Sequence, residues 1–294
     1  MKIGVTFPQT EIGADPAVLR DYIQAAEGLG YSYVLAYDHV LGAQPGNRPE
    51  GWRGVYNHET NFHEPLTLFS YLAAITSTIE FVTGIIILPQ RQTALVAKQA
   101  AEVDVLSGGR LRLGVALGWN MVEYEALNED FTTRGRRISE QIEVMRLLWT
   151  GEVIDYTGKW HRLDRVALKP VPVNRHIPVW IGGMSEPVIK RLARIADGWF
   201  PQFNPTDPTA KDTMARLRAY IQDAGRKIED VGIDGRVNMA NSNPEDWQAS
   251  LEAWSDLGAT HVAVNTMNAG FGSPRAHIDA IRRFKDSVGE LARA

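Results

Sequence analysis

The chain has 294 residues, of which 44% are hydrophobic and 22% are charged, a composition typical of a folded globular protein rather than a disordered one. Its 31 basic and 35 acidic side chains give a formal net charge of −4, which argues against nucleic acid or an anionic membrane as a partner. Cysteine is absent, which excludes disulfides, thiolate metal sites, iron–sulfur clusters and cysteine nucleophiles.

The N-terminus enters a strand-like run directly, without the basic segment and apolar core of a secretion signal. The most apolar stretch, residues 81–89, is interrupted by Thr83 and Gly84 and is much shorter than the ~18 apolar residues that would suggest a membrane span. We therefore expect a cytoplasmic protein.

The first half of the chain alternates short β-branched runs with longer segments of helical period. Asp15-Pro16 predicts one helix start, Pro65 a second, and Thr93 is the expected N-cap of a third, which Gly108-Gly109 closes. A fourth helix is expected from about Thr132 to Trp149. The predicted strands are residues 3–7, 33–40, 81–88 and 111–117.

The second half repeats the pattern after a hairpin-like insertion at residues 153–167, with Gly158 at its turn. Strands are expected at residues 178–182, 198–203, 231–239 and 261–266, and helices are expected to start at residues 185–187, 207–208, 243–244 and 273–274. Eight such alternations, without a linker or a shift in composition, predict one (β/α)8 barrel over residues 1–294, with insertions after strands two and four. An open doubly wound sheet is the structural alternative.

In such a barrel the active site lies at the carboxyl ends of the strands, where apolar runs give way to polar residues. Asp38-His39 is the most prominent such pair, since together they offer a hydrogen-bond acceptor and a proton donor. A buried ion pair is the purely structural interpretation. Because successive strand residues face opposite sides, both side chains reach one site only if the strand ends irregularly.

Two other patterns suggest ligand chemistry. His58 and His63 are five residues apart, which does not match the i, i+4 spacing of a helical zinc motif, so we expect no metal and consider them only as polar groups of a substrate loop. The segment from Gly182 to Ser185 allows close approach of a ligand and presents a helix start to an anion, although a simple strand-to-helix turn explains it equally well. No dinucleotide motif or P-loop is present.

Two further features are ambiguous. Arg134, Arg136 and Arg137 open their helix against its dipole, and Glu140 is the expected partner of an ion-pair network with them. The loop at residues 41–62 is longer than ordinary connections, and it is either a lid over the site or an ordered surface excursion.

Several short motifs along the chain occur together in one known superfamily. They are Asp38-His39, Thr83-Gly84-Ile85, Leu106 to Arg110, Gly114 to Trp119, Leu148-Trp149-Thr150, Pro178 to Gly183, and Ala196 to Trp199. Over nearly the whole chain they resemble the bacterial luciferase-like monooxygenase superfamily. The Asp-His pair and Val96-Ala97-Lys98-Gln99 look most like its mycobacterial and actinobacterial branch, which uses the deazaflavin coenzyme F420, whereas other branches use FMN.

The resemblance implies an oxidoreductase with a flavin-like ring in the barrel mouth and hydride transfer between its C5 and a small organic substrate. It also implies a homodimer. By similarity, Asp38 hydrogen-bonds the ring and His39 faces the substrate as a proton donor or polar anchor. Gly84-Ile85 forms a strand bulge behind the ring, where the family often has a non-prolyl cis peptide bond. Leu117-Gly118 and Gly182-Gly183-Met184-Ser185 carry the ribityl chain and phosphate.

One residue departs from part of the superfamily. Its sugar-phosphate dehydrogenase members have a catalytic glutamate after the glycine that matches Gly118, whereas this chain has Trp119. This departure favours an apolar or planar substrate stacked on Trp119. His63, as a polar group of the substrate loop, is the other expected residue of the substrate pocket. An FMN-dependent monooxygenase that uses reduced flavin and O2, and a catalytically silent flavin-binding barrel, are the alternatives.

Overall fold

A computed structural model describes residues 1–48, 52 and 54–289. Its main sheet has the order β3-β2-β1-β11-β10-β9-β8-β5-β4, all neighbours are parallel, and β3 also pairs with β5, which closes the sheet. β3 and β4 are two parts of one interrupted strand, so the structure confirms a closed barrel of eight parallel strands and not an open sheet. The strands are β1 Lys2–Thr6, β2 Tyr33–Ala36, β3 Glu80–Thr83, β4 Ile86–Ile87, β5 Leu111–Ala116, β8 Val179–Gly182, β9 Gly198–Phe200, β10 Gly232–Asn238 and β11 His261–Asn265.

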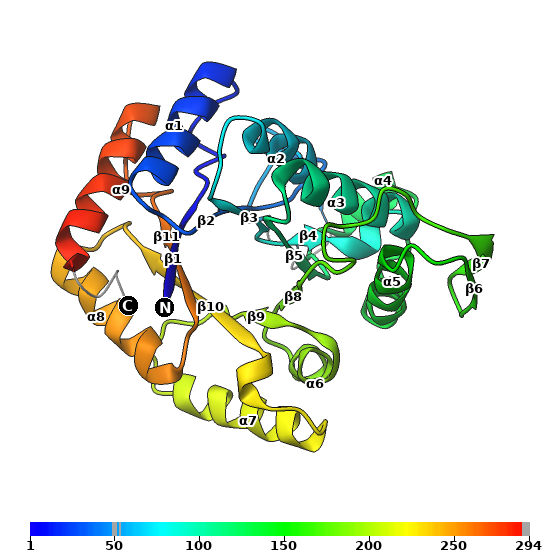
Figure 1. The fold of residues 1–294 in the computed structure, drawn as a ribbon. Helices are drawn as coiled ribbons and strands as arrows, with labels where there is room; N and C mark the ends of the chain where they lie inside the picture. The colour runs from blue at the N-terminus through cyan, green and yellow to red at the C-terminus, as the bar shows by residue number, and fades with distance from the viewer. Residues whose placement is uncertain (49–51, 53, 290–294) are drawn as a thin grey trace.

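Helices surround the barrel and connect one strand to the next (Figure 1). They are α1 Pro16–Gly28, α2 Pro65–Ala73, α3 Thr93–Ser107, α4 Met121–Ala126, α5 Arg134–Trp149, α6 Glu186–Ile195, α7 Ala210–Asp223, α8 Pro244–Leu257 and α9 Pro274–Val288, with short 3-10 turns η1 Leu88–Gln90 and η2 Ile228–Asp230. The predicted insertion is an antiparallel hairpin of β6 Ile154–Thr157 and β7 Arg162–Val166, which projects beyond α5 in Figure 1. Among the helices of the described residues, none combines the length and apolar character needed to cross a bilayer.

Several helix starts follow from the sequence as predicted. The Asp15 carboxylate accepts a hydrogen bond from the Ala17 N–H at 2.9 Å, and Ser273 Oγ accepts one from the Ala276 N–H at 3.3 Å. Asn243 and Asp246 form a reciprocal capping box at the start of α8. In each case a proline follows the cap, where its missing N–H costs nothing.

Two predicted caps are wrong. Gln92, not Thr93, is the N-cap of α3, and the Thr93 hydroxyl is instead 2.6 Å from His161 Nε2 at the end of the hairpin turn. Helix α7 begins at Ala210, not at Asp207-Pro208. The Asp207 carboxylate accepts from the Thr209 N–H and hydroxyl, and this local turn delays the helix.

Three predicted strands are shorter than expected. β2 ends at Ala36 instead of Val40, and β9 ends at Phe200 because Pro201 has no N–H for the ladder. The third predicted strand, residues 81–88, is broken at Gly84-Ile85 and then turns into η1. The peptide bond after Gly84 is trans, since Lys169–Pro170 is the only cis bond in the described chain.

The expected network of three arginines with Glu140 is also wrong. Arg137 pairs with Glu129, while the Glu140 carboxylate accepts hydrogen bonds from three backbone N–H groups of residues 159–161 and from His161 Nδ1. The hairpin turn supplies more hydrogen-bond donors to Glu140 than a neighbouring turn of the helix can. Glu140 therefore anchors the hairpin and does not neutralise the arginines in the first turn of α5.

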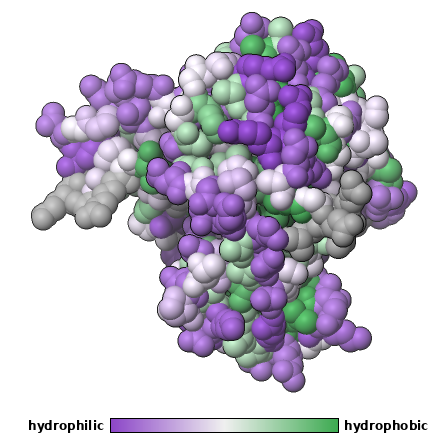
Figure 2. Space-filling model, turned by 90° about the vertical axis from the view of Figure 1, so that its left-hand side faces the viewer, coloured by the Kyte–Doolittle hydropathy of each residue, from purple (hydrophilic) through white to green (hydrophobic). Residues whose placement is uncertain are grey.

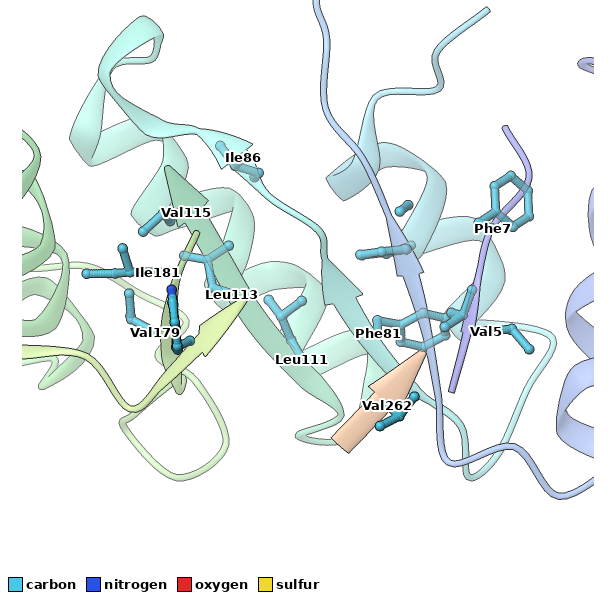
Figure 3. Packing of buried hydrophobic residues seen from close by; sticks show 14 of the residues in the cluster. Val5, Phe7, Phe81, Ile86, Leu111, Leu113, Val115, Val179, Ile181 and Val262 are labelled. Carbon is cyan, nitrogen blue, oxygen red and sulfur yellow. The ribbon is translucent and has the colours of Figure 1, made fainter. Parts of the chain in front are cut away.

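The apolar core lies between the strands and the helices. Leu111, Leu113 and Val115 project from one face of β5, and Val179 and Ile181 lie beside them on β8 (Figure 3). On the outside, the face that carries α1, α8 and α9 is mainly hydrophilic (Figure 2). This two-faced character explains the helical periodicity in the sequence.

A second, smaller apolar cluster fills the barrel interior. It consists of Tyr33, Leu35, Val82, Trp180, Phe200 and Ala263, all of them buried. These side chains form the floor on which the carboxyl-terminal end of the barrel is built.

Candidate active site

A cavity of about 980 Å³ opens at the carboxyl ends of the strands. Seven of the predicted site residues line it: Asp38, His39, Gly84, Ile85, Gly118, Trp119 and Gly182. They come from four strands or the loops that follow them, so segments far apart in sequence share one pocket. A closed parallel barrel with polar residues at its carboxyl end brings such groups together.

Both side chains of the Asp-His pair reach this cavity because β2 ends before them. Asp38 is 3% exposed, and its two carboxylate oxygens accept from the Ile87 N–H at 2.9 Å and from Arg91 Nη2 at 2.8 Å. Burial raises the pKa of Asp38 above its ordinary value, although both hydrogen bonds act in the opposite direction. Arg91 also pairs with Glu64, so Asp38 links β2 to η1 and the start of α2.

His39 is held by a residue that the sequence did not reveal. Its Nδ1 lies 3.0 Å from Oε2 of Glu123, whose other oxygen accepts from the backbone N–H groups of Val40 and Leu41. Burial acts to raise the pKa of Glu123, but these hydrogen bonds hold it below its ordinary value. An ionised carboxylate only accepts, so His39 Nδ1 carries the hydrogen of this bond and Nε2 is left for other partners.

Aromatic rings enclose His39 on several sides. The ring centroids of Tyr56, Phe62 and Trp119 lie 5.4, 4.9 and 5.7 Å from that of the imidazole, all in edge-to-face arrangements. Trp52 lies 6.0 Å from Trp119. Three of these rings belong to the predicted loop at residues 41–62, of which residues 49–51 and 53 lie outside the described chain. The loop thus packs its own aromatics against the site residues.

Glycines keep part of the cavity wall free of side chains. A Cβ on Gly84 would lie 2.0 Å from Leu35 Cδ2, so a side chain there would disturb the barrel interior. Gly118 has φ +65°, and its Cβ would lie 2.6 Å from Ile87 Cγ2. Both positions therefore require glycine at points where the backbone meets the cavity.

The remaining predicted residues do not line the cavity. The Leu117 carbonyl accepts from the Tyr124 hydroxyl at 2.6 Å, and the Gly183 carbonyl accepts from Trp199 Nε1 at 2.9 Å. Met184 Sδ accepts a hydrogen bond from the Gln202 N–H. Ser185 is the N-cap of α6, but its side chain makes no capping hydrogen bond. His63 Nε2 donates to the Gly13 carbonyl, away from the cavity.

The sequence reasoning also missed a charged cluster below the cavity. Arg236 lines the cavity, and its guanidinium is 3.5 Å from the fully buried Asp234, which also pairs with Arg112 at 3.3 Å and accepts from the Tyr33 hydroxyl at 2.7 Å. These residues alternate within strands β2, β5 and β10, and only the strand period indicated that they point into the barrel.

Comparison with known proteins identifies relatives that match most of the chain. The sequence model of the luciferase-like monooxygenase family matches residues 1–280. An uncharacterized protein of Mycobacterium tuberculosis is 32% identical over 222 residues, covering 72% of this chain and 75% of that protein. An FMNH2-dependent dimethylsulfone monooxygenase of Pseudomonas putida is 30% identical over 264 residues, covering 87% of this chain and 68% of that protein.

Solved structures show the same fold at low sequence identity. Monooxygenase RslO1 from Streptomyces bottropensis superposes with a TM-score of 0.79 at 17% identity, covering 98% of each chain. An F420-dependent secondary alcohol dehydrogenase, solved with an F420–acetone adduct, superposes with a TM-score of 0.78 at 16% identity, covering 98% of this chain and 99% of that one. At these identities the likeness concerns the fold alone.

Proposed function

The chain belongs to the luciferase-like monooxygenase family, and from this membership we propose that it is an oxidoreductase that depends on coenzyme F420 and transfers a hydride between the deazaflavin C5 and a small organic substrate. The convergence of Asp38, His39 and three glycines on one cavity carries the proposal. A cavity of this size, whose wall combines aromatic and apolar side chains with polar ones such as Gln202 and Asn238, can hold a cofactor together with a small molecule.

The residues present fit a flavin-like group. Gly84 and Gly118 present bare backbone to the cavity, because a Cβ at either position would collide with Leu35 or Ile87, and Ile85 offers an apolar surface beside them. Gly182 lines the same cavity, and the Ser185 hydroxyl at the start of α6 makes no capping bond, so it is available to a phosphate. In this proposal the ring lies against Gly84-Ile85, and residues Leu117-Gly118 and Gly182 to Ser185 hold the ribityl chain and phosphate. When bound, the cofactor supplies or accepts the hydride.

His39 is proposed to hold or deliver the proton that accompanies hydride transfer. The Glu123 carboxylate accepts from Nδ1, which fixes the imidazole orientation and leaves Nε2 for the substrate. A carboxylate that orients a histidine in this way also stabilises the imidazolium form. Both properties suit a general acid.

Asp38 is proposed to accept a hydrogen bond from the cofactor ring. Its two known partners, Arg91 and the Ile87 N–H, use one acceptor direction of each oxygen and hold the carboxylate in place. A carboxylate offers about four such directions, so one remains for the ring.

The substrate pocket is proposed to include Trp119, with an apolar or planar substrate against its indole. Trp119 is half-buried, and it stands beside the His39 ring. His63 is not included in the pocket, because it does not line the cavity and its imidazole donates to the Gly13 carbonyl.

An FMN-dependent monooxygenase is the alternative function, and the similarity to the dimethylsulfone monooxygenase of Pseudomonas putida favours it. Titration of the purified apoprotein with each cofactor separates the two functions. We expect saturable binding of F420 with weaker or no binding of FMN. Tight FMN binding with none for F420 would reject the deazaflavin assignment.

A catalytically silent barrel is tested by single-turnover measurements. We expect His39→Ala to slow hydride transfer between bound F420 and a substrate about 100-fold or more, the usual contribution of a general acid. An unchanged rate would remove the role assigned to His39. Binding of F420 without turnover of any candidate substrate would favour the silent protein.

A further inference from the structure

Arg236 places a positive charge at the floor of the cavity. Among the described residues that line the cavity, it is the only lysine or arginine. Its guanidinium carbon lies 5.8 Å from the Tyr37 ring and 5.9 Å from the Phe200 ring, and Nε is 3.3 Å from the Tyr37 hydroxyl. The two aromatic rings flank the guanidinium and limit its orientations.

The charges behind Arg236 do not balance it. Asp234 is shared with Arg112, so two guanidinium groups meet one carboxylate. Arg112 lies between Tyr33 and Trp180, at 4.6 and 4.3 Å, and its Nε and Nη2 are buried without a hydrogen-bond partner. His261 contributes no charge to this cluster at neutral pH, because burial and the nearby Arg112 lower its pKa to about 2. The cluster therefore carries an excess of one positive charge in a site that is poorly solvated.

The acidic residues that line the cavity are engaged elsewhere. Asp38 is paired with Arg91, and Asp246 lies exposed at the rim, where it belongs to the capping box of α8. Buried charges are normally paired, and a partly buried guanidinium with one long, shared ion pair lacks a full partner. An anionic ligand group would complete the pairing, because a guanidinium binds carboxylates and similar groups by directed, charge-assisted hydrogen bonds.

We infer that the cavity floor around Arg236 is a subsite for an organic anion, namely a planar or apolar body with one carboxylate-like group directed at the guanidinium. The aromatic and apolar wall of Tyr37, Phe200 and Ile85 suits the body, and Arg236 suits the anionic head. The inference takes the cavity from the proposed function, but it needs neither a cofactor nor turnover. The anionic group belongs either to the substrate or to the polar edge of the cofactor ring.

Benzoate and benzamide are matched probes, because they have nearly the same shape and differ in charge. We expect isothermal titration of the apoprotein to show benzoate binding at least about tenfold tighter than benzamide, the usual effect of one charge-assisted hydrogen bond. Equal affinity of the two probes for the wild-type protein would overturn the inference without any variant.

Variants locate the preference at Arg236. Arg236→Gln is expected to reduce the ratio of the two affinities to about one. Arg236→Lys is expected to retain part of the preference, because lysine keeps the positive charge but lacks the paired N–H donors of the guanidinium. Arg165→Gln, which removes an exposed charge from the hairpin and does not line the cavity, is the control and should leave the ratio unchanged. A preference that survives Arg236→Gln in a folded protein contradicts the inference. If Arg236→Gln does not fold, Arg236→Lys provides the test, and an affinity ratio as high as that of the wild-type protein contradicts the inference.

The source of the anionic group is distinguished by repeating the titration in the presence of saturating F420 or FMN. Benzoate that still binds beside the cofactor assigns the subsite to the substrate. Benzoate that the cofactor displaces assigns it to the cofactor ring. If neither cofactor binds at all, the proposed function fails while the benzoate measurement on the apoprotein still stands.

Discussion

Glu123 connects two segments that are 84 residues apart in the sequence, and no spacing in the chain indicated this. It lies in α4, a short helix that the sequence pattern did not reveal, because six residues are too few for helical periodicity. Arg91 and Arg236 were missed for a related reason. Arg91 follows one expected strand and Arg236 lies inside another, and no spacing in the sequence links either residue to its acidic partner, so these ion pairs became apparent only from the barrel geometry.

The pKa of Glu123 predicts how stability depends on pH. Because the folded protein lowers this pKa below its ordinary value of 4.5, ionised Glu123 stabilises the fold at pH values above 4.5. That contribution is lost as the pH falls through the folded-state pKa, since the carboxyl is then protonated in both states. Glu123→Gln should therefore be less stable than wild type at pH 7, and the difference should shrink below pH 4.5. Urea unfolding at both pH values measures it.

The exposed neighbour Glu125 provides a matched control for this prediction. It is on the same short helix, but its side chain makes no hydrogen bond to another group of the described residues. Glu125→Gln should show no comparable dependence on pH. A stability difference for Glu123→Gln that stays constant from pH 7 to pH 3.5 would mean that lost packing, not the charge, explains it.

At the scale of the elements, the sequence predicted which segments form strands and helices better than where they end. Eight strand positions and the hairpin follow from periodicity and from glycine and proline punctuation. The errors fall where the backbone leaves the ladder to build the site. Residues 37–40 and Gly84-Ile85 look like strand in the sequence, yet their backbone departs from the strand and their side chains line or border the cavity. Local propensity cannot reveal a break imposed by neighbouring strands.

The interruption between β3 and β4 predicts a large effect of a small substitution. Gly84→Ala introduces a Cβ 2.0 Å from Leu35 Cδ2, inside a packed interior, and we expect a loss of about 1–3 kcal/mol in unfolding free energy. Gly28→Ala is the control, because Gly28 is helical and has no atom within 4 Å of the added Cβ. It should be neutral or stabilising by up to about 1 kcal/mol. Urea titrations of both variants test this, and equal effects would show that the crowding at Gly84 is relieved cheaply.

The hairpin is predicted to open locally when its anchor is removed. Three backbone N–H groups of residues 159–161 and the His161 ring donate to Glu140, and His161 in turn contacts Thr93. Glu140→Ala should raise the hydrogen-exchange rates of these three amides at least about tenfold, while the barrel strands keep their protection. Glu143→Ala, one turn along the helix, removes one hydrogen bond to the half-buried Tyr156 and should leave the exchange rates of these three amides unchanged. Faster exchange throughout the barrel would show that the hairpin contributes to global stability.

For the whole molecule, the pairing of β3 with β5 is the feature that distinguishes a closed barrel from an open sheet. The sequence left both arrangements open, because each consists of alternating strands and helices with the same periodicity. In the closed ring every strand has two neighbours, and the interior cluster joins residues of β2, β3, β8, β9 and β11. Separation of the two halves would break two ladders and expose this cluster at once.

The distribution of tryptophan allows a test of whether the halves unfold together. Four of the five buried tryptophans, Trp180, Trp199, Trp247 and Trp254, lie in the second half of the chain, whereas the fifth, Trp149, ends the last helix of the first half and residues 1–116 contain only Trp52. Tryptophan fluorescence therefore reports mainly on the second half, and far-UV circular dichroism reports on the whole barrel. Since closure couples the halves, we expect the two signals to give coincident urea transitions. Separate midpoints would instead identify an intermediate in which one half-barrel persists after the other has unfolded, as chains of this length can form.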